Sequence, residues 1–182
     1  MRADPRKSLI GILEKYLDDV PRRGAEIGVW RGETSKALLD YFPELSLYGI
    51  DNYPKGHYIK TFDGTGPAEA YEEMLDTLAD YGRRSWYCDL PSNIASQGYP
   101  DNSFDFVYID ADHYYDSVKE DINLWYPKVV PGGILSGHDY DGRGDNMKRK
   151  PFGVKKAVDE FCQEKGYELI LGDAHVWALK KR

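Results

Sequence analysis

A short apolar run that leads into a glycine-bracketed turn, Ala25 to Gly32 (AEIGVWRG), is the strongest constraint in this chain. A helix is predicted from about Thr34, directly after the turn. Glycines at positions 28 and 32 would let a ligand approach the backbone, and the first turn of the following helix offers unpaired N–H groups. The segment therefore predicts a strand, loop and helix unit that holds a nucleotide.

Apolar runs of strand length alternate with amphipathic helical periods along the rest of the chain. After the opening motif, strands are predicted at residues 45–50, 84–88, 104–109, 134–136, 167–171 and 176–179. Helices are predicted at about residues 5–20, 34–42, 68–81, 116–129 and 152–165. This order predicts an α/β fold: a three-layer Rossmann-like sandwich of about seven strands, mostly parallel, with an antiparallel last strand.

Length and composition limit the kind of protein. A chain of 182 residues predicts one domain over residues 1–182, because about 100–200 residues is the usual size of a single core. No apolar run approaches the roughly 20 residues of a membrane span, and the N-terminus lacks a secretory apolar region, so a cytoplasmic location without membrane contact is expected. Cys88 and Cys162 are too few for a disulfide framework. The net charge of −7 disfavours nucleic acid as a partner, and the short basic patch at 148–150 does not change that.

Polar residues follow several of the predicted strands. Gly28, Asp51, Asp89 and Asp110 each come after a separate apolar run, and the pair His138–Asp139 follows another. In an open α/β sheet, ligands bind beyond the carboxyl ends of the strands. One carboxylate in such a place could simply cap the next helix, but several of them together favour a binding site.

From Gly24 onward the chain resembles the class I S-adenosylmethionine-dependent methyltransferases, whose first motif is similar to E-I-G-V-W-R-G here. The resemblance implies that Gly28 lets the methionine part of the cofactor lie against the backbone and that Glu26 supports its ammonium group. It also implies that Asp51 takes both ribose hydroxyls and that Asp89 meets the adenine amino group. The residues expected to contact the cofactor are Glu26, Gly28, Trp30, Gly32, Asp51, Asp89 and Asp110.

Three later segments narrow the resemblance, namely DADH, PGGILSGHDY and FGVKKAVDEF. They look most like the small-molecule O-methyltransferases related to macrolide-sugar methyltransferases and cephalosporin-hydroxylase-like proteins. Metal-dependent members hold a divalent cation with an acid after the fourth strand and an acidic pair after the fifth. The resemblance implies Asp110 and Asp139 as ligands, and His138 stands in the place of the first acid of the pair. His113 matches the proposed general base of that group.

The histidine at position 138 leaves open whether a metal binds and which metal it is. Hard magnesium prefers oxygen ligands, whereas imidazole suits manganese, iron, nickel or zinc better. His138 could bind a softer ion, act as a second base, or be a strand-end residue whose neighbour Asp139 is the ligand. The expected cofactors are S-adenosylmethionine and, as an open question, a divalent metal such as magnesium or manganese.

The leading hypothesis is transfer of a methyl group from S-adenosylmethionine to a hydroxyl of a small metabolite. His113 would accept the hydroxyl proton, and a cation would lower the hydroxyl pKa. An N-methyltransferase and a non-catalytic cofactor-binding partner protein stay open as alternatives. An NAD site lacks its G-x-G-x-x-G spacing, and an iron-dependent hydroxylase lacks its His-x-Asp because His138 and Asp139 are adjacent. The 15 tyrosines suit either a substrate rim or a homo-oligomer interface.

Overall fold

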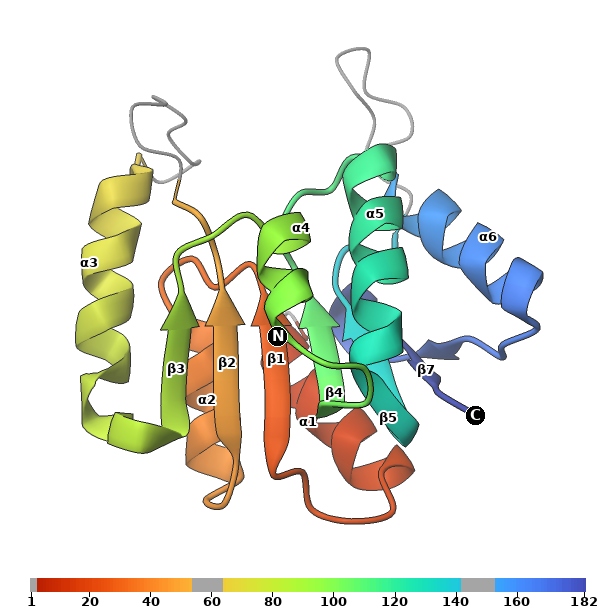
Figure 1. The fold of residues 1–182 in the computed structure, drawn as a ribbon, viewed down its shortest axis with the longest axis horizontal. Helices are drawn as coiled ribbons and strands as arrows, with labels where there is room; N and C mark the ends of the chain where they lie inside the picture. The colour runs from red at the N-terminus through yellow and green to blue at the C-terminus, as the bar shows by residue number, and fades with distance from the viewer. Residues whose placement is uncertain (1–2, 54–63, 142–152) are drawn as a thin grey trace.

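The computed structural model describes residues 3–53, 64–141 and 153–182, and within them a seven-stranded sheet has the order β3-β2-β1-β4-β5-β7-β6 (Figure 1). The strands are β1 (Arg23–Ile27), β2 (Ser46–Ile50), β3 (Ser85–Cys88), β4 (Phe104–Ile109), β5 (Val129–Gly137), β6 (Ile170–Leu171) and β7 (Trp177–Lys180). Neighbouring strands from β3 to β5 pair in parallel, and β7 is antiparallel to both β5 and β6. The predicted Rossmann-like α/β sandwich with an antiparallel last strand is confirmed.

Helices cover both faces of this sheet. One apolar layer contains side chains of α1 (Pro5–Tyr16), α2 (Glu33–Tyr41) and α3 (Pro67–Leu78). The other layer contains side chains of α4 (Ser92–Ala95), α5 (Tyr115–Trp125) and α6 (Val154–Lys165). In Figure 1, α4 and α5 lie in front of the sheet and α1 and α2 lie behind it.

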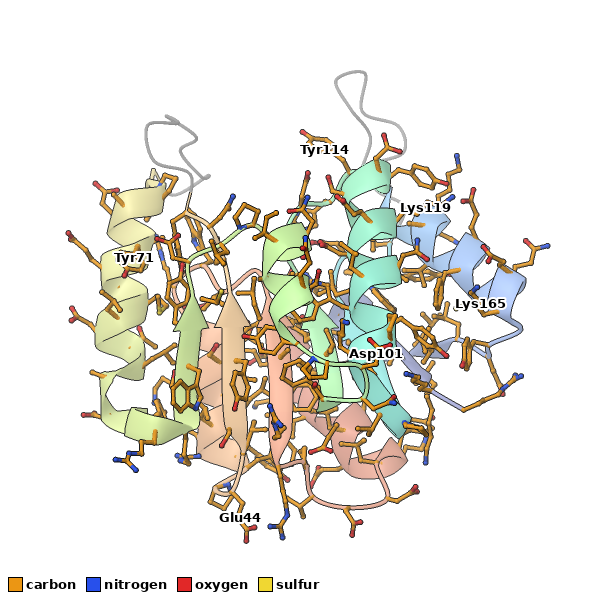
Figure 2. The ribbon with its side chains drawn as sticks, in the orientation of Figure 1. Glu44, Tyr71, Asp101, Tyr114, Lys119 and Lys165 are labelled. Atoms are coloured by element: carbon orange, nitrogen blue, oxygen red, sulfur yellow. The ribbon has the colours of Figure 1, made fainter. Side chains whose placement is uncertain are left out.

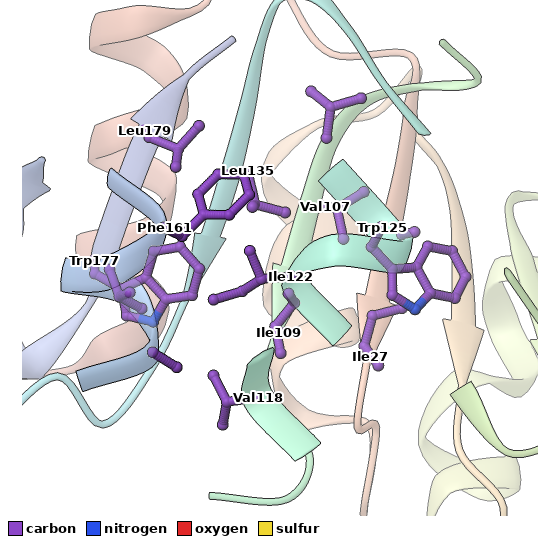
Figure 3. Close-up of a cluster of buried hydrophobic side chains, with 14 of the residues drawn as sticks. Ile27, Val107, Ile109, Val118, Ile122, Trp125, Leu135, Phe161, Trp177 and Leu179 are labelled. Carbon is purple, nitrogen blue, oxygen red and sulfur yellow. The ribbon is translucent and has the colours of Figure 1, made fainter. Parts of the chain in front are cut away.

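The layer under α5 and α6 fixes the helices that follow β4 and β5. Ile122 and Trp125 of α5 are buried together with Phe161 of α6 and Trp177 of β7 (Figure 3). Each large apolar side chain buried in this way contributes about 1.5–3 kcal/mol relative to its exposed state. These contacts hold α5 against the sheet directly after the loop that follows β4.

Some boundaries differ from the predictions. The helix expected at 116–129 ends at Trp125, because Pro127 enters a short 3₁₀ turn, and β5 then begins at Val129 rather than at residue 134. The last turn of the helix expected at 68–81 becomes a 3₁₀ turn with Gly82 at φ 52°. The strand expected at 167–171 is reduced to Ile170–Leu171. The basic patch at 148–150 lies outside the described residues.

Candidate active site

A cleft of about 680 Å³ opens at the carboxyl ends of β1, β2 and β4, between their loops and the helices α4 and α5. Tyr114, which follows His113, lies at the edge toward which the strand arrows point, and Glu44 lies at the opposite edge (Figure 2). The predicted site residues that line the cleft are Gly28, Trp30, Asp51, Asp110 and His113. A separate groove of about 580 Å³ between α1 and α2 contains none of the predicted site residues.

Gly28 joins the end of β1 to the end of β4 without room for a side chain. Its φ is +90°, and a Cβ placed there would come 2.3 Å from the carbonyl oxygen of Asp110. The backbone N–H of Gly28 donates to Ile50 over 2.9 Å, and the N–H of Asp110 donates to Ile27 over 2.7 Å. Only glycine satisfies both the backbone angle and the close approach.

Asp51 is held by the backbone of the loop that follows β1. Its Oδ2 accepts the N–H groups of Val29 at 2.9 Å and of Trp30 at 3.1 Å, and its Oδ1 accepts the N–H of Tyr53 at 3.2 Å. The hydroxyl of Tyr87 donates to the Asp51 carbonyl over 2.7 Å. The carboxylate is therefore fixed in orientation at the cleft, and its role as a ribose ligand stays a prediction.

Trp30 and Tyr53 form an aromatic wall beside this carboxylate. Their rings stack with centroids 6.5 Å apart, and the Tyr53 hydroxyl donates to the Trp30 carbonyl. Trp30 adopts φ 51° and Tyr53 adopts φ 30°, in the left-handed region that bulky residues seldom occupy. The hydrogen bond from the Tyr53 hydroxyl to the Trp30 carbonyl and the stacking of the two rings stabilise both residues in this conformation.

Three of the predicted cofactor residues lie away from the cleft surface. Glu26 is buried beneath the loop and accepts the Ser35 hydroxyl. Burial raises the pKa of Glu26 to about 8 against that hydrogen bond, and the nearby Asp110 and Asp51 add to the rise. Gly32 takes φ 76° at the start of α2. Asp89 is exposed, and neither it nor Gly32 lines the cleft.

The ends of β4 and β5 bring together Asp110, His113 and Asp139. One ligand atom from each lies within 4.8 Å of the other two. The Nε2 of His113 is 2.8 Å from Oδ2 of Asp139 and 3.7 Å from Oδ1 of Asp110. This juxtaposition gives two carboxylates and one imidazole at the edge of the cleft.

His138 lies beside that group but turns one nitrogen away from it. Its Nδ1 is 3.3 Å from Oδ2 of Asp139 and 3.7 Å from Oδ1 of Asp110. Its Nε2 is 2.9 Å from the Ala174 carbonyl. The group of three therefore contains His113, which the sequence predicts as a base, in place of His138, which it predicts as a ligand.

Charge pairing dominates the protonation of these groups. Burial alone would lower the pKa of His113, but the adjacent Asp110 and Asp139 outweigh it and raise the pKa to about 10. Burial would raise the pKa of Asp139, yet hydrogen bonds from His113 and His138 hold it well below its ordinary value. Without another cation present, His113 therefore carries a proton at neutral pH.

Comparison with known proteins identifies the family. Residues 25–140 match a family described as a methyltransferase domain. The chain belongs to this family. It is a protein with a methyltransferase domain.

Solved structures of several methyltransferases share its fold. A protein from Staphylococcus aureus provisionally described as a caffeoyl-CoA O-methyltransferase has a TM-score of 0.72 at 13% identity, over 100% of this chain and 86% of the other. CalS11, a TDP-rhamnose 3'-O-methyltransferase of calicheamicin biosynthesis, has a TM-score of 0.61 at 19% identity, over 97% and 78%. The N-methyltransferase NodS from Bradyrhizobium japonicum, in complex with S-adenosylhomocysteine, has a TM-score of 0.66 at 14% identity, over 97% and 85%. At these identities the likeness concerns the fold alone.

A curated relative matches part of the methyltransferase. The uncharacterized protein y4gI of Sinorhizobium fredii (strain NBRC 101917 / NGR234) is 29% identical over 75 residues, which is 41% of this chain. The chain spans 8% of that relative's length. In the described ranges of the methyltransferase, no helix combines the length and the apolar character needed to cross a membrane.

The cleft of the methyltransferase also contains residues that the sequence predictions did not include. Asp121 of α5 lines it and is 6% exposed, and Ser92, at the start of α4, lies beside it. The Ser92 hydroxyl donates to Oδ1 of Asp121 and accepts the indole N–H of Trp125 at 2.7 Å. Asp121 shares the helix face of Val118, Ile122 and Trp125, so a carboxylate within that apolar stripe was the available signal.

Proposed function

We propose that this methyltransferase transfers the sulfonium methyl group of S-adenosylmethionine to a hydroxyl of a small metabolite. In this proposal Asp110 and Asp139 hold a divalent cation, magnesium or manganese, and His113 accepts the hydroxyl proton. The observation that carries it is the convergence of these three side chains at one edge of a cleft that also contains Gly28 and Asp51. We further propose that residues 1–182 act as one methyltransferase domain.

The donor set of the three residues fits a divalent cation. Two carboxylates and an imidazole lie within 4.8 Å of one another, as ligands of a single ion do. The His113 imidazole lies 2.8 Å from Oδ2 of Asp139, and the two carboxylates raise its pKa, which supports the proposal that this position is suited to a positive charge. Oxygen ligands from Asp110 and Asp139 suit magnesium or manganese.

The cofactor half of the proposal rests on the other end of the cleft. Asp51 is oriented to accept a ribose hydroxyl, and Gly28 leaves the backbone bare beside it. Trp30 lines the same surface. Glu26, buried below the loop, would influence the cofactor's ammonium group through its charge rather than as part of the cleft wall.

The chemistry needs alignment and removal of one proton. Bound S-adenosylmethionine supplies an activated methyl group, and a bound divalent cation supplies Lewis acidity that lowers the pKa of an alcohol. Asp110 and Asp139 would hold that cation beside the acceptor hydroxyl, and the cleft lining would set the direction from which the hydroxyl approaches the methyl group. Neutralisation of the two carboxylates removes the cause of the raised pKa of His113, so that its Nε2 becomes available to take the hydroxyl proton.

A methyl-transfer assay with labelled S-adenosylmethionine tests the proposal. The acceptor panel contains vicinal diols, catechols, sugars and primary amines, each with EDTA and with manganese or magnesium restored. We expect turnover on hydroxyl acceptors that EDTA abolishes and the metal restores. Turnover confined to amines and unaffected by EDTA would contradict the proposal and identify an N-methyltransferase.

Substitution of His113 separates its two candidate roles. His113→Ala is expected to lose turnover but to keep manganese affinity, measured by calorimetry, if the imidazole is the proton acceptor. Loss of manganese affinity with turnover would make it a third ligand and overturn the base assignment. Asp116→Asn is the matched control, because Asp116 is an exposed carboxylate in the first turn of α5 with no part in the cluster.

A further inference from the structure

The end of the cleft that would hold the adenine of the cofactor lies opposite the cluster of Asp110, His113 and Asp139. The strand order places β2 and β3 on one side of β1 and places β4 and β5 on the other. A cofactor whose ribose meets Asp51 at the end of β2 and whose methyl group points toward β4 and β5 must extend its base toward β3 and α4. This part of the cleft is lined by Leu90, Pro91, Ser92 and Asn93.

Asp121 closes this end of the cleft from the side of α5. It is 6% exposed, yet it lines the same cleft as Asp51. A buried carboxylate is costly unless donors satisfy its oxygens. Within the described part of the chain, the Ser92 hydroxyl is the donor that contacts it.

The hydrogen bonds around Ser92 run in one direction. Trp125 has only an N–H to give, so Ser92 accepts from it and must send its own hydroxyl hydrogen to Oδ1 of Asp121. Asp121 is thereby fixed as an acceptor with unused lone pairs. A donor that approaches from the cleft can use them.

The exocyclic amino group of adenine is a donor of this kind. A carboxylate with its lone pairs facing the base edge accepts one N–H from the amino group and repels a carbonyl oxygen at the same place. Glu120 and Asp112, which also line the cleft, add negative charge and provide no competing cation. Leu90 and Pro91 add apolar side chains to the lining, which suit contact with a ring.

Asp89, the residue expected to meet the amino group, is less suited to this role. It is exposed and does not line the cleft, whereas the next four residues do. An exposed carboxylate competes with water for any hydrogen bond to the base.

We infer that Asp121, oriented by Ser92, accepts a hydrogen bond from the exocyclic amino group of the cofactor's adenine and selects adenine over hypoxanthine. The inference rests on the proposed assignment of this cleft to S-adenosylmethionine. It makes Asp121 a specificity-determining residue and Ser92 a positioning residue.

Calorimetry with two product analogues tests the inference in the full chain. S-adenosylhomocysteine carries the amino group, and S-inosylhomocysteine carries a carbonyl oxygen in its place. We expect the wild-type protein to prefer the adenosyl compound by at least about tenfold, since a site built for a donor rejects an acceptor strongly. In Asp121→Asn the side-chain amide can turn a donor toward the carbonyl, so the preference is expected to fall to about one or to reverse.

Three further variants sharpen the result. Ser92→Ala removes the group that orients Asp121 and is expected to reduce the preference by about threefold, which tests the inference even if Asp121→Asn folds poorly. Asp116→Asn removes an exposed charge of the same helix that does not line the cleft, and it is expected to leave the preference unchanged. Asp89→Asn is also expected to leave it unchanged.

The outcomes separate this inference from the cofactor assignment. A wild-type protein that binds both compounds equally would overturn the inference alone. A preference lost in Asp89→Asn but kept in Asp121→Asn would also overturn it and return the role to Asp89. A wild-type protein that binds neither compound would overturn the cofactor cleft and the inference together.

Discussion

The two ends of the cleft are built from different kinds of interaction. At the β1–β2 end, backbone N–H groups of the loop bind the Asp51 carboxylate, and Gly28 packs against the end of β4. At the β4–β5 end, charged side chains neutralise one another, with His113 between Asp110 and Asp139. Backbone geometry and backbone hydrogen bonds fix the first end, whereas the second end consists of charged side chains that pair with one another. The difference suits a cofactor site in one place and a reaction site in the other.

The carboxylates of the cleft show the same contrast in their protonation. Two histidines hold the pKa of Asp139 well below its ordinary value despite burial. Asp121 has no such partner, and burial raises its pKa to about 6 against the hydrogen bond from Ser92, with Glu120 and Asp112 adding to the rise. A paired charge is thus stabilised by the fold, and an unpaired one is tolerated at a cost.

Substitution at Gly28 is expected to have the largest effect, because it disrupts the packing of the β1 loop against β4 at the β1–β2 end of the cleft. Gly28→Ala combines a positive φ with a Cβ 2.3 Å from a backbone oxygen. We expect a loss of at least about 3 kcal/mol in the free energy of unfolding and no measurable binding of S-adenosylhomocysteine. Urea unfolding and calorimetry measure the two effects.

Gly11→Ala provides the matched control for that substitution. Gly11 lies in α1, and a Cβ there meets nothing within 4 Å. It is expected to raise stability by about 0.5–1 kcal/mol and to leave cofactor binding as it is. If Gly28→Ala were as stable as the wild type, the loop after β1 could accommodate a Cβ, and this would contradict the close packing of Gly28 on the end of β4.

Loss of one charge at the β4–β5 end of the cleft is expected to lower turnover and to leave cofactor affinity nearly unchanged. Asp139→Asn removes a partner of His113 at 2.8 Å and one proposed cation ligand. We expect turnover to fall by about a hundredfold or more while the affinity for S-adenosylhomocysteine changes by less than about twofold. Single-turnover kinetics and calorimetry separate the two, with Asp116→Asn as the control. An equal fall in both quantities would mean that the two ends of the cleft do not act independently.

The same contrast explains how much the sequence could predict. The glycine turn, Asp51 and the acids after β4 and β5 follow strands in a regular alternation, so their meeting at one edge of the sheet was predictable. The pairing of His113 with Asp139 depends on side-chain directions in two loops, where no periodicity applies. Asp139 itself adopts φ 58°, and nothing in its sequence neighbourhood requires that conformation.

Residues on helices were harder to predict than residues after strands. The helical period places Asp121 on the buried face of α5, but contact with the cleft depends on where α4 begins, and α4 covers only Ser92–Ala95. The exposure of Asp89, directly after the half-buried Cys88 of β3, depends likewise on a turn geometry that the sequence does not encode in a short pattern.

Measurement of the free energy of unfolding over a pH series is expected to show how much the buried Asp121 carboxylate destabilises the fold. The folded pKa of Asp121, about 6, lies above its unfolded value of about 3.8, so the folded state binds more protons between these values. Stability from this group is complete below about pH 3.8 and is lost as the pH rises to about 6. Asp121→Asn lacks this loss. The difference in the free energy of unfolding between the variant and the wild type is therefore expected to shift in favour of the variant by on the order of 2 kcal/mol from pH 4.5 to pH 7.5. A pH-independent difference would mean that Asp121 is solvated or paired.

Removal of one hydroxyl from the aromatic wall is expected to have the smallest effect. Tyr53→Phe keeps the ring stacked on Trp30 but leaves the Trp30 carbonyl without the hydroxyl donor. A hydrogen bond of this kind contributes about 1 kcal/mol, so the affinity for S-adenosylhomocysteine is expected to fall by about fivefold, with turnover of the saturated enzyme unchanged. Tyr48→Phe is the matched control, because Tyr48 of β2 stacks on Trp86 and its hydroxyl makes no hydrogen bond to the described residues. If Tyr53→Phe instead lowered turnover at saturating cofactor, the wall would take part in the reaction end of the cleft, and the separation of the two ends would have to be abandoned.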